Sequence, residues 1–420
     1  MTPPKAADAI DAVWRIESAR LIAGLARIVG DVGLAEDFAQ DALVAALEQW
    51  PASGIPDNPG AWLMATAKHR AIDHLRRRRM QDTKHEHLGR ELDERQQSPE
   101  QHLADALDDQ VGDNLLSLIF TACHPVLTTE ARVALTLRLL GGLTTDEIAR
   151  AFLVPKSTIQ QRIVRAKRTL AAARVPFEVP RGPELEARLE SVLEVIYLIF
   201  NEGYSATAGA DWVRPALCED ALRLGRILAQ LAADQPEVHG LVALMELQAS
   251  RIRARVGPTG EPILLLDQDR GRWDHLLIGR GLAALERAEA PGGGGGFGPY
   301  GLQAAIAACH ARARTPEETD WTQIVALYDA LAQLLPSPVV ELNRAVALGM
   351  AFGPAAGLEL VDSLRSDPAL AGYHLLPSVR GDLLAKLGRF EEARAEFARA
   401  AAMTQNARER ALLQRKAEAL

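Results

Sequence analysis

Apolar residues recur at helical spacing through nearly the whole chain, and this pattern limits the fold more than any other feature of the sequence. From about residue 183 onward the chain is rich in Ala and Leu, and strand-like alternation is scarce everywhere. A spacing of three to four residues places apolar side chains on one face of a helix, so the pattern predicts an all-α fold. Aromatic residues make up only 5% of the chain, which disfavours large β-sandwich cores.

Length and composition fit a globular protein of several domains. At roughly 150 residues per domain, 420 residues suggest about three domains, and 48% hydrophobic residues are enough for a sizeable core. The three cysteines lie far apart in sequence and form neither a disulfide framework nor a zinc pattern, and we expect Cys123-His124-Pro125 to be buried structure. The sequence therefore predicts no metal site and no cofactor.

The ends and apolar stretches of the sequence predict a cytoplasmic protein without membrane contact. The first residues, MTPPKAADAIDAVW, lack the basic and apolar segments of a signal peptide. The most apolar stretch, Val192 to Phe200, is too short to span a bilayer and contains Glu194.

The net charge of −8 would disfavour nucleic acid as a partner, but it is an average over the whole chain. Two segments of the chain are strongly basic. Residues 148–177 contain seven Lys and Arg and no Asp or Glu, and residues 68–79 contain six against one acid, Asp73. The acid lies elsewhere, in a polar stretch at residues 81–110 and in the C-terminal part. We expect weak DNA binding by the free protein, with a partner needed to present the basic helices.

Residues 144–170 have the pattern of a helix-turn-helix. Thr144 and Glu147 fit a capping box at the start of a first helix, Thr145 to Phe152, and Pro155 suits the entry to a second helix. Four apolar residues give this second helix, from about Lys156 to Leu170, one buried stripe: Ile159, Ile163, Ala166 and Leu170.

The other face of the second helix is polar and basic. Gln can pair with adenine and Arg with guanine in the major groove, while Lys and Thr hold phosphates. A basic, solvated helix of another bundle is the alternative. The candidate DNA-binding residues are Lys156, Ser157, Thr158, Gln160, Gln161, Arg162, Arg165, Lys167 and Arg168.

A second basic helix is predicted to begin at Asn58-Pro59, where Asn is the N-cap and Pro the first helical residue. We expect Trp62, Ala65, Ile72 and Leu75 to face inward. A basic helix with aromatic neighbours can follow a nucleic-acid backbone and stack on opened bases. The candidate contacts are Asn58, Trp62, Lys68, Arg70, Arg76 and Arg77.

The helix before the loop Pro51–Asp57 is predicted to be amphipathic. Its expected inward residues are Leu34, Phe38, Ala42 and Ala45, and its expected outward residues are Glu36, Asp37, Gln40 and Asp41. Taken alone, such an acidic face is usually only solvated.

Three segments in this order, AEDFAQDALVAALEQW, NPGAWLMATAKHRAIDHLRRRR and GLTTDEIARAFLVPKSTIQQRIVRAKRTL, resemble the extracytoplasmic-function sigma factors of bacterial RNA polymerase over about residues 8–172. The resemblance implies sigma region 2 at 8–80, an acidic linker in the RNA-exit path at 81–110, and sigma region 4 at 111–175. Pro155 stands where the family often has a capping Ser.

The resemblance also implies partners and roles. The partners are core RNA polymerase, through the clamp coiled coil and the flap of its large subunit, and promoter DNA. Asp37, Gln40 and Asp41 would dock on the clamp. The helix from Asn58 to Arg79 would recognise and melt the −10 element, with a base flipped near the preceding loop. The helix from Lys156 to Lys167 would recognise the −35 element.

Residues 183–420 resemble the C-terminal helical extension of one group in this family, which ends in tetratricopeptide-like repeats. Phe200 to Ser205 and Gly298 to Ile306 resemble motifs of that group. A weak repeat with an offset of 36 residues (Arg344 onward against Arg380 onward) falls within residues 338–410. We expect a regulatory, protein-binding domain that packs on the sigma domains or on polymerase.

Two polar clusters in this extension raise the question of catalysis. The first, Asn201 to Tyr204, is interpreted as a helix end with Gly203 at C′, and the second, Asp267 to Asp274, as interhelical ion pairs or a contact surface. The glycine run before Pro299 lacks the G-K-[ST] of a P-loop and is expected to be a flexible linker. No nucleophile or metal constellation accompanies either cluster, so we predict no catalytic residues and no enzyme.

A second interpretation is a one-component helix-turn-helix regulator with a ligand-sensing helical domain. The first 80 residues discriminate the two, because such a regulator needs neither a polymerase-docking helix nor a strand-melting helix.

Overall fold

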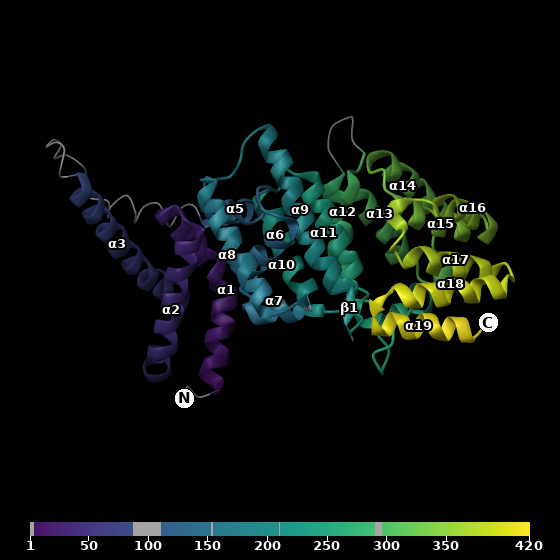
Figure 1. The fold of residues 1–420 in the computed structure, drawn as a ribbon, viewed down its shortest axis with the longest axis horizontal. Coiled ribbons are helices and arrows are strands. Elements are labelled where there is room, and N and C mark those ends of the chain that lie inside the picture. The colour runs from purple at the N-terminus through teal and green to yellow at the C-terminus, as the bar shows by residue number, and fades with distance from the viewer. Residues whose placement is uncertain (1–3, 87–110, 153, 210, 290–295) are drawn as a thin grey trace. The chain divides into compact units, whose positions relative to one another are not determined.

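The computed structural model describes residues 4–86, 111–152, 154–209, 211–289 and 296–420, which are mainly helical (Figure 1). The chain divides into two compact units, Met1–Val195 and Ile196–Leu420. The described residues also contain two short parallel strands, β1 (Ala208–Gly209) and β2 (Gln405–Asn406), and a bridge between Val256 and Pro262. The all-α prediction is confirmed. Most of the predicted acidic linker lies outside the described residues.

The first unit begins with α1 (Pro4–Val29), α2 (Val32–Ser53) and α3 (Pro59–Glu86), which pack on one another. Helix α2 extends through Pro51 and stops at Gly54, whose φ of 84° suits glycine, so the loop is shorter than predicted. Helix α3 continues into the segment predicted as linker.

The same unit continues with α5 (Val111–Ala122), α6 (Thr129–Leu139), α7 (Thr145–Ala151) and α8 (Lys156–Ala172). The predicted connector leads to α9 (Pro183–Tyr204), whose first half belongs to this unit. Arg188 donates to the carbonyl of Phe120 (3.0 Å), and Ser191 donates to that of Cys123 (2.7 Å). These bonds fix the start of α9 to the end of α5.

The second unit is organised around α11 (Pro236–Ala249), which is buried throughout from Val238 to Leu247. Helices α10 (Pro215–Leu231), α12 (His275–Ala288) and α13 (Pro299–Arg312) pack against it. Between α11 and α12 the chain makes three short 3₁₀ turns: η1 (Ile252–Ala254), η2 (Leu265–Asp267) and η3 (Arg270–Arg272).

The remaining helices follow one another as packed neighbours (Figure 1). A 3₁₀ turn, η4 (Pro316–Glu318), precedes them, and another, η5 (Pro368–Leu370), lies among them. The helices are α14 (Trp321–Leu334), α15 (Pro338–Phe352), α16 (Pro354–Leu364), α17 (Leu375–Lys386), α18 (Phe390–Met403) and α19 (Ala407–Glu418).

Two features of α15–α18 agree with the predicted repeat. Gly388 has a φ of 75° just after α17, where the sequence placed a helix end. The paired positions Arg344 and Arg380 each form an ion pair with another helix, to Asp329 (2.8 Å) and Asp362 (2.7 Å) respectively. The assignment to tetratricopeptide-like repeats stays a prediction.

Candidate nucleic-acid interface

The second helix of the predicted helix-turn-helix is α8, and it buries the stripe expected from the sequence. Ile159, Ile163, Ala166 and Leu170 are all buried. Pro155 occupies the N-cap and makes no side-chain cap bond, as the departure at this position suggested. No side chain at the N-cap therefore accepts from the first N–H groups of α8.

Helix α7 supplies the scaffold in front of α8. Thr144 and Glu147 form the predicted capping box: the Glu147 carboxylate accepts from the Thr144 N–H (2.8 Å), and Thr144 Oγ1 accepts from the Glu147 N–H (3.2 Å). An exposed ion pair between Lys156 and Asp146 (2.8 Å) links the beginnings of the two helices. The two helices thus form the predicted helix-turn-helix.

Most of the polar face of α8 is available to a partner. Ser157, Gln160, Gln161, Arg165 and Arg168 are exposed, while Thr158 and Arg162 are half-buried. Exposed amide and guanidinium groups on successive turns of one helix can reach base edges and phosphates.

Lys167 departs from this pattern because its ammonium contacts the Glu36 carboxylate of α2 at 2.6 Å. Arg138 of α6 contacts the same carboxylate at 2.6 Å. Glu36 was expected to face outward, but only 3% of its side chain is exposed. The prediction is wrong here because the side chains of Arg138 and Lys167 reach the Glu36 carboxylate from α6 and α8.

The charge state of Glu36 follows from these contacts. Burial disfavours its ionised form, but the charges and hydrogen bonds of Lys167 and Arg138 outweigh burial and hold the pKa of Glu36 below its usual value. Glu36 is therefore a buried carboxylate that joins three helices of the first unit, a role that the sequence pattern did not reveal.

The face of α2 predicted to contact polymerase is only partly free. Asp37 and Asp41 are exposed, and Gln40 is half-buried and donates to Glu36 (2.5 Å). Partial burial and the nearby carboxylates Glu36 and Asp41 raise the pKa of Asp37, against the opposing effect of Lys167. Asp41 forms an ion pair with Arg70 of α3 (3.1 Å), so the predicted polymerase and DNA surfaces meet here.

The buried face of α2 agrees with the prediction at Ala42 and Ala45 but differs at Leu34 and Phe38. Ala35, Ala39, Ala42 and Ala46 are completely or almost completely buried, whereas the larger Leu34 and Phe38 are half-buried. Alanine permits close helix approach, so the small residues rather than the large ones mark the contact.

Helix α3 begins as predicted, with the Asn58 side chain accepting from the Ala61 N–H (3.0 Å). The expected inward face is shifted, because Leu63, Ala67 and Ala71 are buried and Ala65 is exposed.

The predicted DNA contacts on α3 are not all alike. Trp62 is half-buried and packs edge-on against Trp50, with ring centroids 5.2 Å apart. Arg70, Arg76 and Arg77 are exposed and Lys68 is half-buried. Trp62 therefore has a packing role in this structure, and the basic residues present the accessible charge.

The polar cluster after α9 is built from helix-to-loop contacts. Glu202 forms an ion pair with Arg214 and accepts from the Thr207 hydroxyl (2.9 Å). Tyr204 Oη accepts from Arg251 (2.8 Å). Gly203 lies inside α9 rather than at C′, so that prediction is wrong. A Cβ there would lie 2.7 Å from the Cys218 nitrogen, so glycine permits the close approach of α10.

In the Cys123-His124 pair, the cysteine is buried as expected and the histidine is half-buried. Cys123 is buried against Thr136 (3.4 Å), and burial raises the pKa of its thiol to about 11. Among the described residues no group of three or more His, Cys, Asp and Glu is arranged to hold a metal ion. No helix in the described part of the chain is long and apolar enough to cross a membrane.

A helix-turn-helix with a polar exposed face, preceded by a basic helix and an acidic one, defines a transcription protein that binds DNA. Comparison with known families gives the same result. Residues 16–80 match Sigma-70 region 2 and residues 117–170 match Sigma-70 region 4. Residues 188–289 match a family of unknown function, DUF6596.

Relatives support the family directly. The probable RNA polymerase sigma-C factor of Mycobacterium bovis is 32% identical over 36% of this chain and 76% of its own length. The probable ECF RNA polymerase sigma factor SigI of Mycobacterium tuberculosis is 28% identical over 56% of this chain and 85% of its own. The chain therefore belongs to the extracytoplasmic-function family of RNA polymerase sigma factors, and it directs transcription initiation.

A longer match covers the C-terminal extension as well. A protein of Rhizobium meliloti (strain 1021) described as uncharacterized is 44% identical over 93% of this chain and 90% of its own length. The comparison with solved structures found no match. Family membership implies core RNA polymerase and promoter DNA as partners, and sigma factors are not a class of enzymes.

Proposed function

We propose that the chain binds core polymerase through Asp37, Gln40 and Asp41 of α2, with α3 at the −10 element and α8 at the −35 element. In this proposal residues 8–80 act as region 2, 111–175 as region 4, and 183–420 as a regulatory domain without covalent chemistry. The location is cytoplasmic, where polymerase and template are found. The observation that carries the proposal is the exposed Gln and Arg face of α8 above a buried apolar stripe.

The ion pair between Lys167 and Glu36 adds a condition. In the structure the Lys167 ammonium is held by the Glu36 carboxylate of α2. We infer that Lys167 must exchange this contact for a DNA phosphate before it contributes fully to −35 recognition. This requirement supports weak DNA binding by the free protein.

Binding to core polymerase tests the proposal against the one-component regulator. The full chain, tagged and purified, is mixed with purified core polymerase and analysed by size-exclusion chromatography. A stable complex supports the proposal. Binding of duplex promoter DNA without any binding of core polymerase would favour the regulator instead.

Arg165→Ala tests the −35 assignment. A side chain that forms a good bidentate pair with a base contributes about 1–3 kcal/mol of discrimination, so binding of the polymerase complex to −35 DNA should weaken by about fivefold to 150-fold. Arg280→Ala, an exposed arginine on α12, is the matched control and should have no effect. Equal DNA affinity of wild type and Arg165→Ala would remove Arg165 from the interface.

A further inference from the structure

A hollow of about 730 Å³ lies in the second unit, between the segments on either side of the 3₁₀ turns and the beginning of α10. Its lining includes apolar side chains and the ring of Trp273, which is 4% exposed. Two exposed arginines, Arg253 and Arg272, and one half-buried acid, Asp274, also line it. The hollow falls within the residues that match the family of unknown function. The apolar lining residues are Val213, Pro215, Ile252 and Val256.

Further arginines lie beside Trp273: the guanidinium carbons of Arg251 and Arg270 are 5.7 and 4.8 Å from its ring centroid. Arg251 donates to Tyr204 Oη (2.8 Å), and Arg255 donates to the Tyr204 carbonyl (3.1 Å). Arg270 donates to the carbonyls of His310 (2.6 Å) and Ala313 (2.7 Å).

These partners are neutral oxygens. Within the described part of the chain no ion pair joins a carboxylate to any of five arginines: Arg251, Arg253, Arg255, Arg270 and Arg272.

The positive charge of these arginines lowers the pKa of neighbouring groups. Burial and the charges of Arg251 and Arg270 lower the pKa of His310 to about 4. Burial and Arg251 also lower the pKa of Arg255, against the favourable effect of Tyr204. The carboxylates of Asp269 and Asp274 accept from backbone N–H groups, at 2.9 Å from Gly271 N and 3.0 Å from Leu276 N respectively. Accepting an N–H bond does not remove the charge of a carboxylate, so Asp269 and Asp274 offset part of the positive charge, as Glu317 and Glu318 do for Arg270. In the described part of the chain, however, neither Asp269 nor Asp274 forms an ion pair with any of the five arginines.

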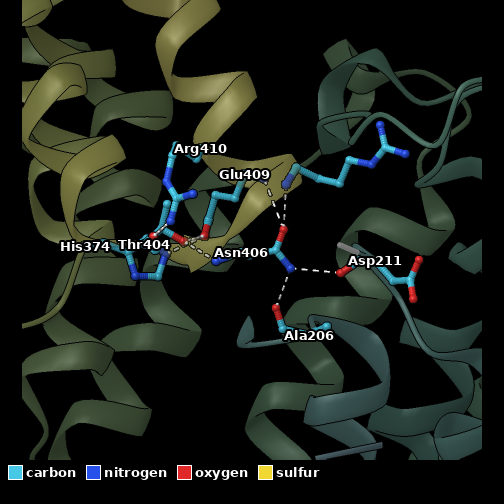
Figure 2. Close-up of polar contacts among 8 residues, drawn as sticks. Ala206, Asp211, His374, Thr404, Asn406, Glu409 and Arg410 are labelled. Atoms are coloured by element: carbon cyan, nitrogen blue, oxygen red, sulfur yellow. Dashed lines mark hydrogen bonds and ion pairs between the residues drawn. The ribbon is translucent and has the colours of Figure 1, made fainter. Parts of the chain in front are cut away.

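Val213, one of the lining residues, follows a loop that is held by the C-terminal end of the chain. Figure 2 shows the contacts of Asn406 that hold this loop. Asn406 Nδ2 donates to the carbonyls of Ala206 (2.9 Å) and Asp211 (2.8 Å), which lie in the loop leading to Val213. Its Oδ1 accepts from the N–H groups of Arg408 and Glu409 at the start of α19. The loop is thus held from the C-terminal side, and the Glu202–Arg214 ion pair holds it at α9. The side of the hollow at Val213 is therefore held at both ends of its loop.

The charge, the apolar lining and the openness of the hollow indicate which kind of molecule it binds. Guanidinium groups bind carboxylates and phosphates in bidentate geometry, so the occupant is an anion. The apolar side chains of the lining would contribute little to the binding of a DNA backbone. They can, however, bury an apolar side chain of a peptide. Small-molecule sites enclose most of their ligand, whereas this hollow is largely open to solvent. These features fit an extended acidic peptide segment that carries an apolar residue.

We propose that the hollow binds an acidic segment of core RNA polymerase, with its carboxylates on Arg253 and Arg272 and an apolar side chain on the apolar lining beside Trp273. This inference rests on the proposed function, because core polymerase is the protein to which a sigma factor binds. It assigns the extension a second contact to polymerase besides the face of α2. Arg and Trp are residue types that dominate many protein interfaces.

The test is the affinity of the full chain for purified core polymerase, measured by biolayer interferometry at two salt concentrations. The variant is the double substitution Arg253→Glu and Arg272→Glu. We expect core binding to weaken about tenfold or more, with a smaller loss of affinity between low and high salt than in wild type. Arg253→Ala with Arg272→Ala should weaken binding in the same direction but less.

The control changes the same charge outside the hollow. Arg280→Glu with Arg287→Glu alters two exposed arginines of α12 that do not line it, and should leave core affinity unchanged. Far-UV circular dichroism and thermal melting establish that each variant is folded. If the glutamate pair does not fold, the alanine pair decides.

Three outcomes overturn the inference: wild-type affinity in the folded hollow variants, an equal loss in the α12 control, or weakened promoter DNA binding with unchanged core affinity. The last outcome would assign the hollow to DNA. Absence of core binding by the wild-type chain would instead contradict the proposed function, so the two failures are distinguishable.

Discussion

Glu36 shows how a single residue can link three helices. Its carboxylate is buried between Arg138 and Lys167, and both cations come from helices distant in sequence. Removing one partner of a buried ion pair leaves the others uncompensated and strongly destabilises a protein. Because Arg138 and Lys167 are about one fifth exposed (18% and 21%), water compensates them in part and the cost is reduced.

We predict that Glu36→Gln lowers the free energy of unfolding by about 2 kcal/mol at pH 7. The folded-state pKa of Glu36 lies below its unfolded value, so its stabilisation is present above about pH 4.5 and is lost as the pH falls through the folded-state pKa. Urea unfolding at pH 7 and at lower pH measures both. Glu48→Gln, an exposed carboxylate on α2, is the control. A difference that grows on acidification would contradict the assignment.

Asp41 and Asp37 allow the polymerase face to be tested without disturbing the fold. Asp41→Asn breaks an exposed ion pair with Arg70, and such pairs contribute about 0–1 kcal/mol to stability. We therefore expect a nearly unchanged melting temperature for Asp41→Asn and for Asp37→Asn, with weaker core binding for both. Intact affinity for core polymerase in both variants would show that α2 does not dock there.

At the scale of elements, the sequence was sufficient where a helix has large apolar residues on one side only. The stripe of α8 was predicted residue by residue because Ile and Leu alternate with charged residues there. In α2 and α3 the buried face consists largely of alanines. The sequence does not reveal that face, because alanine is equally acceptable at buried and exposed positions. The burial of Glu36 depends on how α6 and α8 pack, which helical spacing does not determine.

The cluster after α9 illustrates the same limit. The sequence located the polar residues at Asn201–Tyr204 and at Asp267–Asp274, but not the arginines at 251, 253 and 255 that lie near them. Their alternation with apolar residues was the available signal. It was missed because no helical pattern assigns a face to a 3₁₀ turn.

We predict opposite effects for two helical glycines of the second unit. Gly203→Ala places a Cβ 2.7 Å from a backbone nitrogen of α10, so overpacking should destabilise the unit by about 1–3 kcal/mol. Gly279→Ala adds a Cβ in open space within α12 and should stabilise by about 0.5–1 kcal/mol. Differential scanning calorimetry compares the two. Equal melting temperatures would refute the close approach of α9 and α10.

At the scale of the whole molecule, the ends of the second unit depend on each other. Asn406 joins the loop after α9 to the start of α19, although the two are about 200 residues apart in sequence (Figure 2). Cutting the chain after residue 175 would also remove α9, whose first half covers the end of α5 in the first unit. A truncation that tests the extension should therefore keep α9.

We predict that Asn406→Asp loosens the loop at Ala206 and Asp211, whose carbonyls Asn406 holds. The carboxylate can still accept from the α19 backbone, but it cannot donate to the two carbonyls and would repel them. Leaving such buried groups unpaired costs about 1–3 kcal/mol. Hydrogen exchange in this loop should accelerate, while Gln405→Glu, an exposed neighbour with the same charge change, should not alter it. Unchanged hydrogen exchange in Asn406→Asp would show that the hydrogen bonds of Asn406 do not hold this loop.

The central claim is that this chain directs core polymerase to promoters through α3 and α8. Run-off transcription with purified core polymerase on genomic promoter fragments tests it most directly. The account predicts transcripts that appear only when the chain is added and that decrease with Arg165→Ala but not with Arg280→Ala. No chain-dependent transcript from any fragment, with a core polymerase that responds to another sigma factor, would contradict it.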